Sequence, residues 1–501
     1  MRLLRNRSDG KSLSNYFGRT AWENDEHVSG DSAAPDSKTI DDVDLRKKRP
    51  RPLLKFILAF SIGSFFFLFP IGWNGQTTIP LDVVVGLIQE AFPTLLEYFT
   101  FGLIVAGGLL TTVSMANYHG IVTIDDELVG RFQLDYWQTS KIFWLFRVVG
   151  IAIAVPILLD TGPDWLLSGS TSGVVWDGLL LTIALVIPIG AVFVNLLAEL
   201  GGLQFVGTLS QPMMRPLFKL PGRAALDSAA SWLGSFSIGY YLTRNVFDRG
   251  GYNKREVFAI CTCFATGNLG TVGAIAAVLG ILHVFPIVVF LYLISVILTA
   301  VILVRIPPLS TVPNEFVAEP DPEPEFSGSF SDYVRFAFNE AIRTAEVGAS
   351  IPRSAVEGLI DGMKLTGMML GTILTIGMSA VILNQYTPVF AILSTPLVPI
   401  LSAFGIPDPQ MAATSVILGG AEMFIGATFA VGTDLITKVF VVIVVSSQAI
   451  FFAASAPMMV DMFDDIPIRF RDLFVLFLMR TALLIPITAA LVHGALFVGL
   501  L

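Results

Sequence analysis

The segment ALDSAASWLGSFSIGYYLT, residues 225–243, is apolar enough to enter a membrane, yet cations flank it on both sides. The flanking cations are Arg215, Lys219, Arg223, Arg244, Arg249, Lys254 and Arg255. Because short cytoplasmic loops of membrane proteins are rich in Lys and Arg, both ends of the segment are predicted to be cytoplasmic. A single crossing would place four of these seven cations outside. The segment is therefore predicted to be a re-entrant hairpin that enters and leaves on the same side.

The composition of the whole chain is that of an integral membrane protein. Of 501 residues, 54% are apolar, 14% are charged and 39 are phenylalanine. The formal net charge is -9, and no basic face interleaves with aromatic residues, so a nucleic-acid partner is not expected. Cys261 and Cys263 would point in different directions on a helix, and we interpret both as small core residues.

Apolar runs long enough to cross about 30 Å of hydrocarbon predict an all-α polytopic protein with about nine crossings. The predicted crossings are residues 53–72, 95–116, 141–159, 176–198, 256–280, 284–304, 362–384, 438–458 and 473–498. Residues 1–52 are predicted to be a disordered cytoplasmic tail, because they are polar and poor in apolar residues. A three-helix scaffold over 53–175 follows, and an acidic cytoplasmic linker over 306–332 divides the remainder.

A second ambiguous segment, MAATSVILGGAEMFIGATFAVG at residues 411–432, has flanks without Lys or Arg. With the N-terminus placed in the cytoplasm by RKKRPR at 46–51, this hairpin is predicted to open to the outside, and the C-terminus is predicted to be external. The surrounding sequences also repeat, since LSQPMMRPLFKL at 209–220 echoes LSTPLVPILSAF at 393–404. Residues 176–305 and 333–501 are therefore predicted to be inverted-topology repeats, an arrangement typical of secondary transporters with a solute site near the bilayer midplane.

The second hairpin contains a glutamate, Glu422, in the stretch GGAEMFIG at 419–426. An ionised glutamate is costly in hydrocarbon and is by default a functional-site candidate. Gly419 and Gly420 would let the chain turn and let a solute approach the backbone closely. The structural alternative is a protonated or hydrogen-bonded glutamate, or one paired with Arg480 in the last crossing. Both interpretations remain open.

Further candidate solute or ion ligands occupy corresponding positions of the two repeats. They are Gly234, Ser235, Ser237, Thr266, Asn268, Ser446, Ser447 and Gln448. The stretch ATGNLGTVG at 265–273 indicates local unwinding, which would offer carbonyl groups to a cation or solute. The alternatives are that the serines bond to their own helix and that the small residues serve close helix packing.

Two stretches resemble the Gate-domain (nucleoside recognition domain) membrane proteins, specifically the YjiH-like group. They are the first hairpin with the residues that follow it, LDSAASWLGSFSIGYYLTRNVFDRGGYNKREVFAICTCFATGN, and GGAEMF in the second copy. The order of elements over roughly 50–500 also resembles that of the concentrative nucleoside transporters. This resemblance implies that the two hairpin tips contact the solute. It also implies a sodium or proton site beside the first hairpin.

Two function classes follow from these patterns. The first is a secondary transporter of a small polar solute, with Na⁺ or H⁺ coupling and no other cofactor, in the plasma (inner) membrane. The alternative is a non-transporting membrane scaffold or sensor that acts with another Gate-domain protein. A homo-oligomer and a Gate-domain partner are both compatible with the sequence. No enzyme is expected, because no HExxH, phosphate-loop or Ser/His/Asp pattern occurs and metal ligands are scarce, with four histidines in all.

Overall fold

The computed structural model of the chain describes residues 50–320, 330–420, 423–448, 455–463, 466 and 469–501. Within this part the chain is helical apart from one antiparallel pair of strands, β1 (Ile71–Trp73) and β2 (Gln76–Thr78). Seven helices are long and apolar enough to cross a membrane. The prediction of an all-α polytopic membrane protein is confirmed. The predicted tail over 1–52 falls almost wholly outside the described residues.

The N-terminal scaffold contains three of these long helices, α2, α4 and α6, joined by shorter elements. Its helices are α2 (Pro50–Leu68), α3 (Pro80–Ala91), α4 (Pro93–Tyr118), α5 (Asp126–Phe132), η4 (Leu134–Trp137), α6 (Lys141–Leu158) and α7 (Asp164–Leu167). Proline in the first turn suits α3 and α4, because the first amides of a helix have no acceptor within it. The Ser140 side chain caps α6 by accepting a hydrogen bond from the Phe143 amide.

The first repeat follows in one long, kinked helical run and several short helices. Its elements are η5 (Gly173–Leu180), α8 (Leu181–Leu197), η6 (Ala198–Gly202), α9 (Leu203–Phe218), α10 (Ala224–Leu233), α11 (Phe236–Asp248), α12 (Lys254–Cys263), α13 (Leu269–Val278), η7 (Leu282–Val284), α14 (Phe285–Leu303) and η8 (Leu309–Thr311). The kink lies in η6, where Gly201 adopts a φ of 106°. A Cβ at that glycine would lie 2.3 Å from the Ala341 carbonyl oxygen, so α15 can pack closely there.

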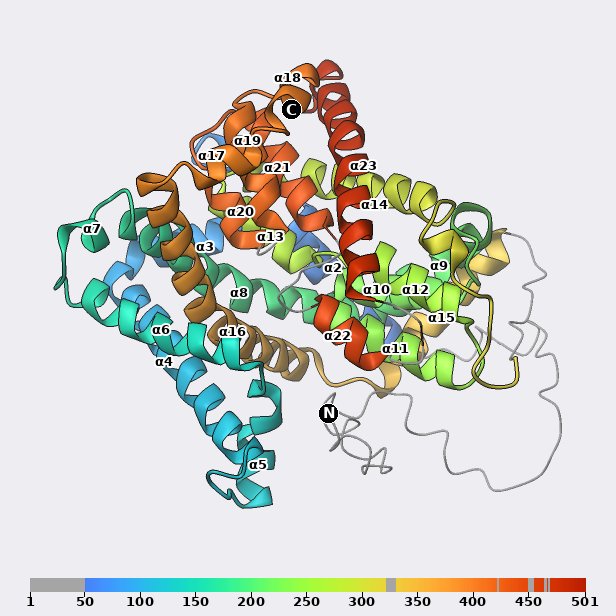
Figure 1. The fold of residues 1–501 in the computed structure, drawn as a ribbon. Helices are drawn as coiled ribbons and strands as arrows, with labels where there is room; N and C mark the ends of the chain where they lie inside the picture. The colour runs from blue at the N-terminus through green and yellow to red at the C-terminus, as the bar shows by residue number, and fades with distance from the viewer. Residues whose placement is uncertain (1–49, 321–329, 421–422, 449–454, 464–465, 467–468) are drawn as a thin grey trace.

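The predicted second repeat, residues 333–501, has a similar order of elements. Its helices are α15 (Phe330–Val347), α16 (Ile351–Tyr386), α17 (Val389–Ser394), α18 (Val398–Ala403), α19 (Pro409–Gly419), α20 (Met423–Thr428), α21 (Leu435–Ser447), α22 (Ser455–Met462) and α23 (Phe470–Phe497). In both regions a long helical run is followed by a helical hairpin, a broken helix and a final long helix, and the short helices α17 and α18 precede the hairpin in the second region alone. In Figure 1, α19 and α20 approach the centre of the molecule from the upper left, and α10 and α11 lie at the lower right.

Both ambiguous segments form helical hairpins. In the first, Thr243 on α11 donates to the Asp227 carboxylate on α10 at 2.9 Å, so the two helices run antiparallel. In the second, a Cβ at Gly426 would lie 2.6 Å from the Gly419 amide nitrogen, so α20 packs directly on α19. The tip of the second hairpin, residues 421–422, lies outside the described residues. The hairpins are shown as folded units, and their entry into a membrane from opposite sides stays a prediction.

Seven of the nine predicted crossings each overlap one of the seven long apolar helices, although the crossing predicted over 53–72 extends four residues past the end of α2 at Leu68. The other two, residues 256–280 and 438–458, are each divided into shorter helices. The helix α15 begins inside the predicted linker over 306–332 and was not predicted. Its apolar residues alternate along the sequence with charged ones, so its mean hydropathy resembles that of a linker.

Glycines bring α16 close to the scaffold. A Cβ at Gly107 of α4 would lie 1.9 Å from the Gly367 carbonyl oxygen, and one at Gly150 of α6 would lie 2.3 Å from the Gly371 oxygen. Both positions accept only glycine at this distance, because any side chain would clash with the α16 backbone. The helix α16 therefore joins the scaffold to the second repeat.

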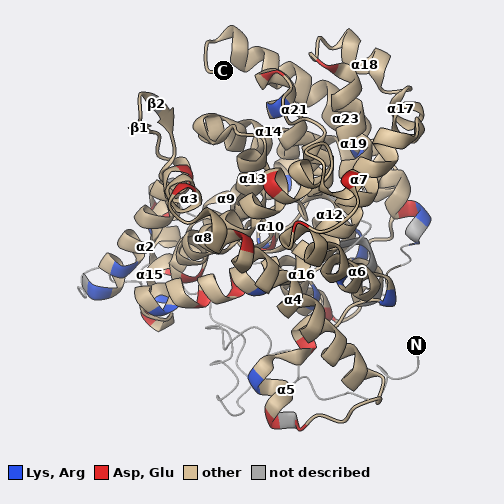
Figure 2. Cartoon of the chain, turned by 90° about the vertical axis from the view of Figure 1, so that its left-hand side faces the viewer, with Lys and Arg blue, Asp and Glu red and all other residues tan. Residues whose placement is uncertain are grey.

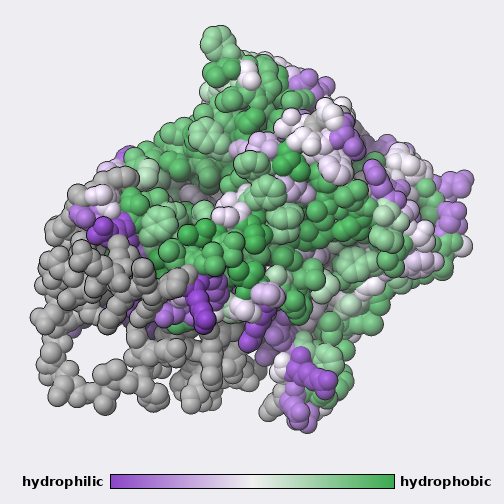
Figure 3. Space-filling view, turned by 180° about the vertical axis from the view of Figure 1, so that it is seen from behind, coloured by the Kyte–Doolittle hydropathy of each residue, from purple (hydrophilic) through white to green (hydrophobic). Residues whose placement is uncertain are grey.

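The outer surface matches a protein surrounded by lipid. Leu54, Leu109 and Leu145, on three of the long scaffold helices, are each at least half exposed. Figure 3 shows hydrophobic side chains over much of one face, with hydrophilic residues mainly at its edges. In Figure 2, Lys and Arg gather near α2, α15 and α5, in the lower half of the view. Such a broad exposed apolar surface is typical of a membrane protein rather than a soluble monomer.

Candidate functional site

The first broken helix is interrupted by five non-helical residues, FATGN at 264–268. The helix α12 ends at Cys263, and α13 starts after Asn268, whose side-chain Oδ1 accepts from the Thr271 amide at 2.8 Å. Asparagine is among the best residues for starting a helix in this way. The same oxygen accepts from the Thr271 hydroxyl at 2.9 Å. The predicted unwinding over 265–273 is confirmed at residues 265–268, whereas residues 269–273 are helical and belong to α13.

The second broken helix has its interruption at nearly the same place in the repeat. The helix α21 ends at Ser447, and Gln448 is its C-cap residue with extended backbone. Residues 449–454 lie outside the described residues, and α22 begins at Ser455. The polar triplet SSQ thus coincides with the end of a half-helix. The last carbonyl groups of such a helix have no donor within it.

The two interruptions touch each other. The Gly267 amide donates to the Ser446 carbonyl oxygen at 2.9 Å. A Cβ at Gly267 would lie 3.2 Å from that oxygen and would crowd this contact. Tyr292 of α14 supports the unwound segment, because its hydroxyl lies 2.6 Å from Thr266 Oγ1 and 2.5 Å from the Gly267 oxygen. The two repeats therefore meet through their broken helices, in the junction formed by residues 263–268 and 446–448.

A buried arginine completes the junction. Arg480 of α23 is 1% exposed, and its Nε donates to the Ser447 carbonyl oxygen. Its Nη1 donates to the Cys263 carbonyl oxygen at 3.1 Å. These oxygens belong to the last helical residues of α12 and α21, so one guanidinium group serves both half-helix ends.

The tip of the first hairpin is attached to this junction. Asn268 Nδ2 donates to the Gly234 carbonyl oxygen at 2.5 Å. The next residue, Ser235, caps α11, and its hydroxyl lies 2.8 Å from that of Ser237. Gly234 and the two serines are partly exposed. Asn268 thus links the hairpin tip to the start of α13 with one side chain.

The second hairpin contacts the junction through its first helix. Gln448 Nε2 donates to the Val416 carbonyl oxygen at 3.2 Å. A Cβ at Gly419 would lie 3.2 Å from Gln448 Oε1, and one at Gly420 would lie 2.3 Å from the Phe477 ring. The absence of side chains at both glycines therefore allows the hairpin to approach α21 and α23. Glu422, the acidic candidate, lies outside the described residues.

Three buried polar atoms of the junction have no hydrogen-bond partner among the described residues. They are Ser446 Oγ, Gln448 Oε1 and Arg480 Nη2. Leaving such a group unpaired costs about 1–3 kcal/mol, so a ligand that pairs with it recovers that free energy. The set contains a donor, an acceptor and a hydroxyl that can do both, which suits a neutral or anionic polar solute.

The structure brings together most of the residues chosen from sequence. Gly234, Thr266, Asn268, Gly419, Ser446 and Gln448 all contact the junction or belong to it. The Ser447 hydroxyl instead bonds back to the Ile443 carbonyl oxygen of its own helix, while its own carbonyl accepts from Arg480. Whether any of these residues binds a solute stays a prediction.

Sequence reasoning did not assign Tyr292 or Arg480 to the site. Arg480 had a usable signal, because a lone arginine in the middle of an apolar crossing is a functional-site candidate by default. From the sequence, Arg480 was considered only as a possible ion-pair partner of Glu422. Tyr292 offered no signal, because tyrosine occurs in many crossings with its hydroxyl near the membrane surface.

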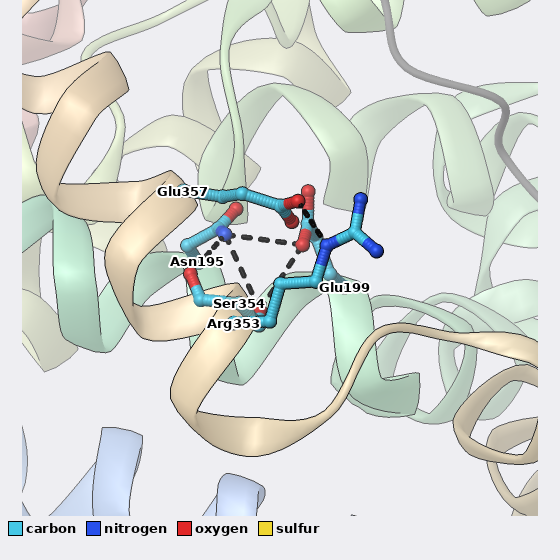
Figure 4. Close-up of polar contacts among 5 residues, drawn as sticks. All are labelled: Asn195, Glu199, Arg353, Ser354 and Glu357. Carbon is cyan, nitrogen blue, oxygen red and sulfur yellow. Dashed lines mark hydrogen bonds and ion pairs between the residues drawn. The ribbon is translucent and has the colours of Figure 1, made fainter.

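A second polar cluster lies away from this junction, where α8 meets the start of α16 (Figure 4). The Glu199 carboxylate accepts from Asn195 Nδ2 at 3.0 Å and from the Ser354 hydroxyl at 3.1 Å. Asn195 also donates to the Ser354 carbonyl oxygen at 2.9 Å, and Arg353 pairs with Glu357 at 2.8 Å. The packing of α8 against α16 brings these side chains within hydrogen-bonding distance of one another. The cluster joins α8 to α16 and is a structural contact.

Part of the chain matches the model of a known protein family. Residues 180–282, from the end of η5 to the start of η7, match the Gate family model, described as nucleoside recognition. The prediction of a Gate domain is confirmed for these residues. An uncharacterized protein of Alkalihalophilus pseudofirmus is 28% identical over 448 residues, which cover 88% of this chain and 94% of that protein.

Solved structures of the transporter CNTnw also resemble the chain. The inward-facing substrate-bound state is 14% identical with a TM-score of 0.39, and the match covers 84% of this chain and 98% of that chain. A variant in an outward-facing state is 14% identical with a TM-score of 0.37, covering 84% and 99%.

Proposed function

We propose that the protein is a secondary transporter of a small polar solute, with nucleoside-like solutes as the first class to test. The solute would bind at the junction of the two broken helices, next to the hairpin tips. The observation that carries this proposal is the contact between the interruptions, Gly267 to Ser446, in a protein whose long helices suit a membrane. Non-helical backbone at membrane depth is tolerated where it is buried in protein or lines a water-filled cavity.

The chemistry of the junction supports a polar solute. Ser446 Oγ, Gln448 Oε1 and Arg480 Nη2 offer hydrogen-bonding groups that the described residues leave unpaired. A purely structural junction would be expected to pair its buried polar groups, because unpaired ones destabilise the fold. The match of residues 180–282 to a nucleoside recognition family supports testing nucleosides first.

Alternating access in this proposal follows from the two hairpins. A half-helix of about ten residues rises about 15 Å, so a hairpin tip reaches the middle of a bilayer. If the hairpins open on opposite sides, each forms a gate to one compartment. Because the sequence carries no phosphate-loop motif, uphill transport would draw on an ion gradient, with Na⁺ or H⁺ as the coupling ion.

Uptake by purified protein in proteoliposomes tests the proposal. Labelled uridine and adenosine serve as probes, with labelled leucine as a solute of another class. Each is offered with a sodium gradient, a pH gradient or neither. We expect saturable uptake of at least one probe, which empty liposomes do not show. Absence of uptake for all nucleosides, nucleobases and amino acids would favour the scaffold or sensor alternative.

A pair of variants connects uptake to the site. Glu422→Gln is expected to abolish uptake while the protein still elutes as the wild-type species on size exclusion. Glu199→Gln is the matched control, because Glu199 lies in η6 and bonds to Asn195 of α8 and Ser354 of α16, away from the junction. Unchanged uptake by Glu422→Gln would remove Glu422 from the mechanism.

A further inference from the structure

The position of Arg480 is unusual for an arginine in a membrane helix. It lies ten residues after the start of α23 at Phe470, which is about 15 Å along the helix axis. That depth is about half the thickness of the hydrocarbon layer. Among the described residues no ion pair to Arg480 is found. Its guanidinium group instead bonds to backbone carbonyl oxygens.

Those oxygens come from two half-helix ends. Cys263 is the last residue of α12, and Ser447 is the last residue of α21. The C-terminus of a helix carries a partial negative charge, because its last carbonyl dipoles are unopposed. Two such ends that meet in a low-dielectric interior repel each other unless a positive charge lies between them.

In transporters with broken helices, carbonyl groups at half-helix ends commonly coordinate the coupling cation. We propose that in this protein Arg480 is itself that cation. Its guanidinium group takes the place of a mobile sodium ion between the ends of α12 and α21, so no sodium ion is needed to neutralise these two helix ends. This inference rests on the proposed function, because a coupling ion is meaningful only for a transporter.

The covalent attachment of this cation has a mechanistic consequence. A bound sodium ion leaves when the site opens, and its departure lets the two helix ends separate. Arg480 cannot leave, because α23 carries it through every conformation. The two broken helices are then held together by a constant charge, and a sodium gradient would do no work at this position. Of the two coupling ions considered above, the inference excludes sodium at the junction.

Thermal stability in lipid nanodiscs tests the proposal without knowledge of the solute. Wild-type protein is melted in chloride salts of sodium, potassium and N-methylglucamine at equal ionic strength. We expect the same apparent Tm in all three salts. Arg480→Ala is expected to melt roughly 5 °C lower in N-methylglucamine, because two helix ends lose their buried cation.

Small cations should restore the variant. Millimolar sodium or methylguanidinium is expected to raise the Tm of Arg480→Ala saturably and to leave the wild type unchanged. Arg147→Ala is the matched control, because Arg147 is also a buried arginine in a long helix but donates to the Thr111 hydroxyl instead of helix-end carbonyls. It should lose stability without responding to either cation.

Three results would overturn the proposal. They are a saturable rise in wild-type Tm with sodium, an Arg480→Ala variant that melts like the wild type, and a destabilised variant that neither cation restores. Should Arg480→Ala fail to fold, the variant Arg480→Lys tests the proposal instead. Lysine keeps the charge, so this variant should fold, melt below the wild type, and show no change in Tm with sodium; a variant that sodium stabilises saturably would overturn the proposal. Because melting does not require transport, a protein that moves none of the probes can still pass or fail this test.

Discussion

Asn268 is the residue whose replacement tests the architecture of the site most directly. Its side chain does two jobs, since Oδ1 caps α13 at Thr271 and Nδ2 holds the tip of the first hairpin at Gly234. Loss of a helix N-cap costs about 1 kcal/mol. Loss of one ordinary hydrogen bond costs about another 1 kcal/mol. Asn268→Ala is therefore expected to lower the free energy of unfolding by about 2 kcal/mol.

The two contributions can be separated by a second substitution. Asn268→Ser keeps an N-cap oxygen but lacks the amide that donates to Gly234. It should recover about 1 kcal/mol of the stability while the hairpin tip stays loose. Local hydrogen exchange reports on the tip alone. The amides of residues 232–237 should exchange about fivefold faster in both variants, which corresponds to about 1 kcal/mol of local opening.

Asn253→Ala provides the matched control. Asn253 caps α12 in the same way, with its side chain accepting from the Glu256 amide at 3.0 Å, but it does not contact the hairpin tip. This variant should lose stability without faster exchange at 232–237. Two results would contradict the proposed link between Asn268 and the first hairpin. One is wild-type exchange rates at 232–237 in Asn268→Ser, and the other is equally fast exchange there in Asn253→Ala.

Three further predictions use other contacts. Ser446→Ala should raise the KM of solute uptake about tenfold without lowering the apparent Tm, because the Ser446 hydroxyl has no partner in the described part of the chain. Ser447→Ala should leave KM unchanged, because the Ser447 hydroxyl bonds to its own helix. Tyr292→Phe should reduce the free energy of unfolding by about 1–2 kcal/mol, measured by thermal melting, since Thr266 and the Gly267 carbonyl lose a shared partner. Gly150→Leu should destabilise the protein by about 3 kcal/mol through collision with α16, whereas a comparable substitution in α4, Gly102→Leu, meets open space and should be neutral in the same assay.

The sequence was sufficient to predict features that depend on local composition. Both hairpins were predicted because the flanks at the two ends of each apolar segment have the same charge character, and the unwinding near Asn268 was predicted from Gly267, Gly270 and Gly273. The charge pattern around residues 225–243 also identified the first hairpin as a special segment. These are properties of a few neighbouring residues, and local physics determines them.

Contacts between distant segments could not be predicted in the same way. Arg480 bonds to Cys263, 217 residues earlier, and no local pattern joins these positions. The helix α15 was missed for a different reason, because its apolar residues are spaced by charged ones and its hydropathy falls below that of a crossing. Its role depends on the faces of α9 and α2 on which it packs, and those faces exist only in the folded protein.

The distribution of close contacts indicates which parts of the protein can move. The helices α8 and α16 pack backbone to backbone, since a Cβ at Gly362 would lie 2.7 Å from the Pro188 Cα. The tip of the first hairpin is held to the junction by the hydrogen bond from Asn268 to Gly234, whereas the second hairpin also packs closely on α21, where a Cβ at Gly419 would lie 2.7 Å from Val445. Breaking one such bond costs about 1 kcal/mol, whereas separating tightly packed helices sacrifices many contacts at once. We therefore expect the tip of the first hairpin to move more readily than the second hairpin, while α8 and α16 stay packed together.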